Sequence, residues 1–427
     1  RQTSSDMSVA FNSDVNLTVE IAFDSDPFAT SQTFSDVSAY IREFSIDRGR
    51  QHDLADYQTG TASVVLNNSD DRFNPLNTSS PYYDATAGES KISPFRQVKI
   101  SGAYDGTTTV LFRGFIQSYP ESFGGQGADS SVRINCVDAF KIFNLNTIGA
   151  RGWKLGSAGF SNLGQSTRLG YVDQQELSSA RISRLLDAFG WSSTDRQIST
   201  GDLQVQAGQS VNDNLLTAMK SVETAEQGQF YISSDGKATF RDRNFKRTQQ
   251  FTSQATFGNG VGELPFSDVI TTLDDSKILN IISVTRDGGT EQVLQDTSSI
   301  AKFGARQDSL SNTLNVSDAD ALAIAEQRLA QFSNTGVRIE GLIVNPLANT
   351  SLWNQVLIRE LGDKVTIKVP TTVSTIMDFD VHLDRISHSV NAVNQTWTWQ
   401  LRTSSGSEVG AWVLGSSRLN ESTNLAW

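Results

Sequence analysis

The sequence is poor in the residues that usually build reactive, cross-linked or membrane-spanning structures. Its 427 residues include one cysteine, three histidines and eight prolines. The single Cys136 excludes a disulfide within the chain, and no apolar run reaches the ~18 residues that a membrane-spanning helix needs. The first residues carry no apolar signal segment, so we expect no stable membrane insertion. Cys136 shares a strand face with Val132 and Ile134, which predicts a buried core thiol.

Basic residues are also scarce. Lysine and arginine total 35 against 47 aspartates and glutamates, which leaves a formal net charge of −12. Nucleic-acid binding needs clustered Lys and Arg to neutralise phosphates, so this balance argues against a nucleic-acid-binding surface. An acidic surface would still let DNA pass without retaining it, because it repels phosphates.

The sequence does contain segments of alternating apolar and polar residues, which are typical of β-strands, and polar turns separate these segments. Residues 37–83 predict two strands followed by a long loop rich in Asn, Asp and Pro. The Asp105-Gly106 pair predicts a hairpin, and a further strand follows at 132–137. A sheet of five or more antiparallel strands leaves no edge strand unpaired when it closes on itself, so we expect a β-barrel.

The middle of the chain changes to helical spacing. Apolar residues at i, i+3, i+4 and i+7 from Ile182 predict a helix that ends at Gly190. A second helix is expected to open with Ser210 and Asp213, and a β-hairpin near 230–240 follows it. The middle region is therefore predicted to be a small α+β unit.

Patterns in the last third of the chain repeat those in the first. The stretch 278–288 resembles 40–49, and 363–369 resembles 96–101, which favours a duplicated β domain. The predicted fold is mainly β, with two antiparallel β-barrels and an α+β insertion. The expected divisions are an N-terminal arm or edge strand at 1–36, a first barrel at 37–148, the α+β region at 149–265, a second barrel at 266–405 with a helix at 318–332 capped by Ser317 and Asp320, and a C-terminal tail at 406–427.

Two stretches mimic metal sites but have simpler interpretations. His382, Asp384 and His388 would share one strand face, yet nothing in the sequence supplies a closed set of ligands or residues that would orient them, and we expect a surface strand. Residues 67–75 resemble a calcium loop, although Arg72 stands where such a loop needs glycine. Side-chain-to-backbone turns are the preferred interpretation of that loop.

The tryptophans divide into two groups. Trp397 and Trp399 alternate on a strand and are predicted to be sheet core rather than a sugar platform. Trp412 and Trp427 lie in a tail too short for a core of its own. Large apolar groups there need a partner or the chain's own barrel to bury them, and both alternatives stay open.

The order of several stretches resembles that of tail hub proteins, also called minor tail proteins, of long-tailed bacteriophages. The first stretches are Y-I-R-E-F-S-I-D-R-G-R, T-G-T-A-S-V-V-L-N-N-S-D-D-R-F-N-P-L-N-T-S-S-P-Y-Y, P-F-R-Q-V-K-I and L-F-R-G-F-I-Q-S-Y. Later ones are A-R-I-S-R-L-L-D-A-F-G-W, F-Y-I-S-S-D-G-K-A-T-F-R-D-R and L-G-D-K-V-T-I. The resemblance spans roughly residues 37–403.

This resemblance implies a baseplate-hub-like protein whose two barrels are tail-tube-like. It implies a homotrimer that forms a pseudo-sixfold ring at the distal tail tip of the virion, assembled in the host cytoplasm. Such a ring continues the tail tube and conducts DNA during ejection without specific binding. The implied partners are a distal tail or tail-tube protein, the tape-measure protein and tip spike or fibre proteins. No hydrolase domain is evident, so no enzymatic activity, cofactor or metal is expected.

Two alternatives remain at this point. The first is a tail-associated peptidoglycan hydrolase that depends on His382 or His388, and the second is a carbohydrate-binding β protein that depends on a surface tryptophan. If the chain is a hub, the turn-rich loop and the tail are where we expect contacts with partners. The candidate contact residues are Arg72, Phe73, Pro75, Tyr82, Tyr83, Trp412, Leu414, Leu419 and Trp427.

Overall fold

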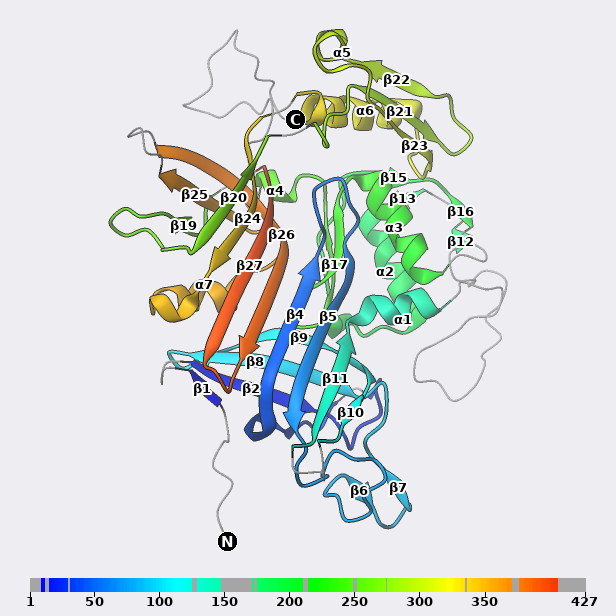
Figure 1. The fold of residues 1–427 in the computed structure, drawn as a ribbon. Helices are drawn as coiled ribbons and strands as arrows, with labels where there is room; N and C mark the ends of the chain where they lie inside the picture. Colours follow the sequence, from blue (N-terminus) through cyan, green and yellow to red (C-terminus); the bar gives the residue numbers. More distant parts are fainter. Residues whose placement is uncertain are drawn as a thin grey trace.

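The computed structural model shows a mainly β protein with helices on two sides of the sheets and in one insertion (Figure 1). This confirms the predicted fold class. None of the helices in the described part of the chain has both the length and the apolar composition needed to cross a bilayer. The described residues are 9–11, 15–29, 31–124, 129–146, 171–172, 175–209, 214–248, 252–273, 275–334, 336–370 and 376–405.

The first barrel is built from five antiparallel strands in the order β8-β9-β11-β5-β4. Their bounds are β4 (Ile41–Gly49), β5 (Gln58–Asn67), β8 (Gln97–Tyr104), β9 (Thr107–Ser118) and β11 (Ser131–Val137). β2 (Val15–Ile21) pairs with β8, and β3 (Ser35–Asp36), just before β4, pairs with the other edge of β2. The strands therefore close on themselves around an apolar interior that includes Val19, Val64 and Ile134.

The second barrel repeats this strand order as β25-β26-β27-β24-β20. Its strands are β20 (Asp268–Thr272), β24 (Arg338–Val344), β25 (Lys364–Pro370), β26 (Ile376–Asn391) and β27 (Thr396–Ser405). The short strand β19 (Thr256–Phe257) lies beside β25, and Leu264, just before β20, bridges to β19. β19 runs parallel to β25, whereas β2 runs antiparallel to β8. The two halves thus share five strands in one order and differ in the strand that closes them.

The predicted match between 278–288 and 40–49 is wrong. β21 (Ile281–Arg286) lies in a separate sheet with β22 (Gln292–Gln295) and β23 (Gln307–Thr313), and the counterpart of β4 is β20. The apolar face of β21 packs on α6 (Asp318–Phe332) instead of on a barrel, so the alternation that suggested a repeat serves another core. We call residues 275–334, which enter between β20 and β24, the inserted unit.

The helix predicted at 318–332 is confirmed as α6, with the predicted capping box. The Ser317 hydroxyl accepts from the Asp320 N–H, and the Asp320 carboxylate accepts from the Ser317 N–H. Two backbone donors at the helix start are therefore satisfied locally. This explains why sequence alone located the helix so well.

The middle region packs on the barrels as one continuous core with them. It holds α1 (Ala139–Leu145), α2 (Ser178–Phe189), α3 (Leu215–Glu226) and the hairpin β17 (Gln229–Ile232) and β18 (Ala238–Arg241). α2 ends as predicted at Gly190, whose φ of 86° is left-handed. α3 begins after Asn214, whose side chain accepts from the Thr217 N–H, while Ser210 and Asp213 lie outside the described residues.

The two barrels are joined through β26, which is 16 residues long. Residues 376–382 of β26 pair with β25, and residues 385–391 pair with β4 of the first barrel. At the change of partner, Asp384 is fully buried, and its Oδ1 accepts from Arg50 Nε at 3.1 Å and Nη2 at 2.9 Å. Burial alone would raise the pKa of Asp384, but the charges of Arg50 and Lys246 lower it below its usual value.

Removing one partner of this buried pair should destabilise the junction. Arg50→Met leaves the Asp384 carboxylate buried without its charge partner, and we expect the free energy of unfolding to fall by about 3–5 kcal/mol. The matched control is Arg133→Met, which breaks the exposed pair of Arg133 with Glu43 and should cost no more than about 1 kcal/mol. Chemical denaturation of both variants measures the difference, and equal losses would contradict it.

Candidate partner-binding surfaces

The histidines of β26 are buried, so the prediction of a surface strand is wrong. His382 is 2% exposed and His388 is 4% exposed. β26 lies in the interior of the joined sheet, with β27 on one side and β25 and β4 on the other. A register shift between Leu383 and Arg385 also breaks the even spacing that would have placed Asp384 on the histidine face.

Both imidazoles are held neutral by their surroundings. His382 Nδ1 lies 3.1 Å from the carbonyl oxygen of Gly362, and His388 Nδ1 accepts from Trp397 Nε1 at 3.3 Å. Burial lowers the pKa of each histidine to about 3, helped by Lys246 near His382 and by Arg48 near His388. Within the described residues, no three His, Cys, Asp or Glu side chains are grouped to hold a metal ion.

Residues 68–96 between β5 and β8, which we call the turn loop, are shaped by side-chain-to-backbone hydrogen bonds, as predicted. The Oδ1 atom of Asn68 accepts from the Phe73 N–H, that of Asn74 from the Leu76 N–H, and that of Asn77 from the Ser79 N–H, each at 2.9 Å. The oxygens that suggested a calcium loop therefore serve the loop's own backbone.

The turn loop has an aromatic core of its own. Phe73 is fully buried and stacks on Tyr82 at 5.6 Å, and Tyr82 stacks on Phe23 of the first barrel at 4.0 Å. The guanidinium of Arg72 lies 4.0 Å over the ring of Tyr40. Of the predicted contact residues, Phe73 thus faces inward, and Arg72, Tyr82 and Tyr83 are partly covered.

The exposed part of the turn loop is its tip. Pro75 is exposed, as is its neighbour Leu76, which retains 86% of its surface. Sequence reasoning missed Leu76, although its place between two Asx turns, in N-P-L-N, was a usable signal. A large apolar side chain held outward by ordered backbone is suited to contact a partner. The other predicted contacts, Trp412, Leu414, Leu419 and Trp427, lie outside the described residues.

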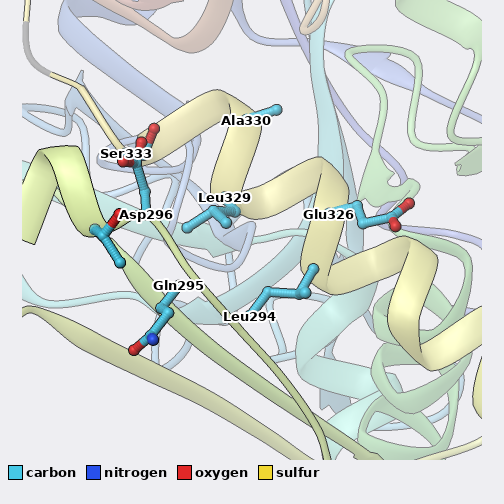
Figure 2. Close-up of a pocket in the computed structure, with 8 residues that line it drawn as sticks. Leu294, Gln295, Asp296, Glu326, Leu329, Ala330 and Ser333 are labelled. Atoms are coloured by element: carbon cyan, nitrogen blue, oxygen red, sulfur yellow. The ribbon is translucent and has the colours of Figure 1, made fainter.

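A shallow hollow of about 430 Å³ lies on the inserted unit. Figure 2 shows that its lining includes Leu294 on β22 and Leu329 on α6. Asp296 at its rim already accepts from the Ser298 and Ser299 N–H groups as the cap of α5 (Thr297–Phe303). Because this hollow is open to solvent, it does not enclose a small molecule in the way that ligand pockets do.

Comparison with known proteins shows the fold. No family model matches the chain, and no curated protein is similar to it in sequence. A tail protein from Neisseria meningitidis MC58 has a similar structure, with a TM-score of 0.53 and 10% identity over 92% of this chain and 97% of that one. The 43 kDa tail protein of prophage MuSo2 from Shewanella oneidensis has a TM-score of 0.50 and 8% identity, over 91% of this chain and 96% of that one. The chain has the fold of phage tail proteins, as the resemblance predicted.

Two substitutions in the turn loop distinguish a residue that stabilises the loop from one that is exposed for contact with a partner. Phe73→Ala empties a fully buried site, and we expect it to lower the free energy of unfolding by about 3–5 kcal/mol. Leu76→Ala removes a solvated side chain and should change stability by less than about 0.5 kcal/mol. Denaturation of the purified variants measures both values. A large loss for Leu76→Ala would show that the tip is packed rather than presented.

Proposed function

We propose that this chain is a structural hub protein of a bacteriophage tail tip. In this proposal, three copies form a pseudo-sixfold ring that continues the tail tube and conducts DNA during ejection. One observation carries the proposal: a single chain holds two closed barrels of the same strand order, joined in one sheet by β4 and β26. Three copies would supply six barrels, and a ring of this kind matches a sixfold tube on one side and a threefold tip on the other.

The charge of the chain suits a conduit for DNA. A formal net charge of −12 gives a ring of three copies a strongly acidic character. Phosphates are repelled by such a surface, so DNA would pass without specific binding and without being retained. The proposed site of action is the distal end of the tail in the virion, after assembly in the host cytoplasm.

The proposed partners follow from that position. A distal tail or tail-tube protein would lie on one face of the ring, tip spike or fibre proteins on the other, and the tape-measure protein would pass through the lumen. We assign one contact to the turn-loop tip, where Pro75 and Leu76 are exposed on a backbone fixed by Asx turns. The tail residues 406–427, with their tryptophans, are proposed as a second contact.

The buried residues argue against the hydrolase and against a sugar platform built from the two tryptophans of β27. A hydrolase dependent on His382 or His388 would need an imidazole that reaches substrate or a metal-bound water, and both rings are enclosed. Trp397 and Trp399, the tryptophans first weighed as a sugar platform, are 1% and 0% exposed inside the second barrel. We therefore propose a structural role without enzymatic activity.

Native mass spectrometry and imaging of tail tips test this proposal. We expect the purified protein to form trimers, and we expect antibodies against it to label the distal end of isolated tails. Averaged images should show a ring with three strong and three weak features, because each copy contributes two similar barrels that carry different insertions. A stable monomer that is absent from virions would overturn the proposal.

A further inference from the structure

The chain contains one junction between barrels, made by β4 and β26. It also contains the counterparts of these two strands, which do not pair with each other within the chain. Within the chain, β4 of the first barrel pairs along residues 43–49 with the second half of β26. The counterpart of β4 in the second barrel is β20, which pairs with β24 on one side. Among the described strands, none pairs with the other side of residues 268–271 of β20, where the sheet path ends.

The strand that would receive β20 is also present. The counterpart of β26 is β9, which continues through Pro120 into β10 (Glu121–Ser122). The first part of β9 pairs with β8, as the first half of β26 pairs with β25. From Phe115 onward, β9 and β10 pair with β11, as β26 pairs with β27. In the described chain, no strand lies on the outer side of residues 117–123, the side that β4 covers on β26.

Both edges carry exposed apolar side chains. Ile270 on β20 is 45% exposed, and Leu273 directly after it is 64% exposed. Phe123, directly after β10, is 59% exposed. Residues 268–273 read D-V-I-T-T-L and contain no lysine or proline, the residues that commonly block edge strands from pairing. The receiving edge does contain Pro120, but its carbonyl accepts from the Arg133 N–H of β11, so the missing N–H of the proline faces β11 and not the outer side. An apolar, unblocked edge is suited to pair with another strand.

We infer that β20 of one copy pairs antiparallel with residues 117–123 of a second copy, repeating between chains the junction that β4 and β26 make within one. This inference rests on the proposed ring and names the surfaces that close it. A second copy is the occupant because the chain's own junction shows a barrel of this strand order accepting the equivalent edge at the equivalent place. The two surfaces that meet are different, so the contact between copies is head-to-tail. Such a contact generates a ring when the rotation that relates successive copies returns to the first copy.

Cysteine cross-linking tests the pairing directly. The double variant Ile270→Cys with Phe123→Cys, treated with a short bismaleimide, should give covalent dimers and trimers but no larger species. Each single variant should stay monomeric on a denaturing gel, whereas a mixture of the two single variants should give dimers. The native Cys136 is 1% exposed and serves as an internal unreactive thiol.

A charge placed on the edge should weaken assembly without unfolding the chain. We expect Ile270→Lys to raise the concentration of half-dissociation by more than about tenfold, because pairing would bury the ammonium group. The matched control is Val293→Lys, on the edge strand β22 of the inserted unit, where the native side chain is 53% exposed. Val293→Lys should leave both the assembly and the unfolding midpoint unchanged.

The outcomes separate this inference from the proposed function. Trimers that form and label tail tips, but neither cross-link nor respond to Ile270→Lys, would overturn the strand pairing and leave the hub function standing. Strong dimers from the single Ile270→Cys variant would also overturn it, because like edges would then meet. If the chain is monomeric and absent from tails, the pairing and the hub function both fail.

Discussion

The two-barrel frame depends on β26 changing partners halfway along its length. At the change, Gly49 of β4 adopts a φ of 119°, and a Cβ there would collide with the carbonyl oxygen of Asp384. Only glycine permits so close an approach. The same Asp384 carbonyl accepts from the Arg50 N–H, while its carboxylate pairs with the Arg50 guanidinium. Backbone conformation and a buried ion pair therefore fix the point where one barrel becomes the other.

A second set of contacts sets the angle between the barrels. Glu360, between α7 (Leu352–Ile358) and β25, pairs with the buried Arg48 at 2.8 Å and accepts from the Ser234 N–H of the middle region at 2.8 Å. α7 also packs on β8, where a Cβ at Gly102 would lie 2.6 Å from Leu357 Cδ2. The first barrel, the second barrel and the middle region meet at these groups. The pairing of Glu360 with the buried Arg48 favours one arrangement of the two barrels, because a shift of one barrel against the other would leave these charges unpaired.

The sequence predicted those features of the fold that depend on interactions between neighbouring residues. The capping box of α6, the left-handed Gly190 and the Asx turns of the turn loop depend on neighbouring residues, and each was visible in sequence. The match between 278–288 and 40–49 was wrongly predicted because alternating apolar and polar residues indicate only that one face of a strand is buried. They do not indicate which core buries that face. β20, the true counterpart of β4, has little alternation because much of it is exposed in the single chain. The burial of His382 and His388 was equally hidden, since it comes from joining two sheets.

The two barrels are alike in their strands and different in their connections. Between its first two core strands, β4 and β5, the first barrel has the short segment 50–57, where the second has the inserted unit between β20 and β24. Between β5 and β8 it has the turn loop, where the second has α7. A ring of three copies would therefore present a nearly sixfold frame of strands and a threefold pattern of insertions. In the proposed ring, the strands would form the joints between barrels and the connections would differ between them, so one chain would match both a sixfold tube and a threefold tip without a separate adaptor.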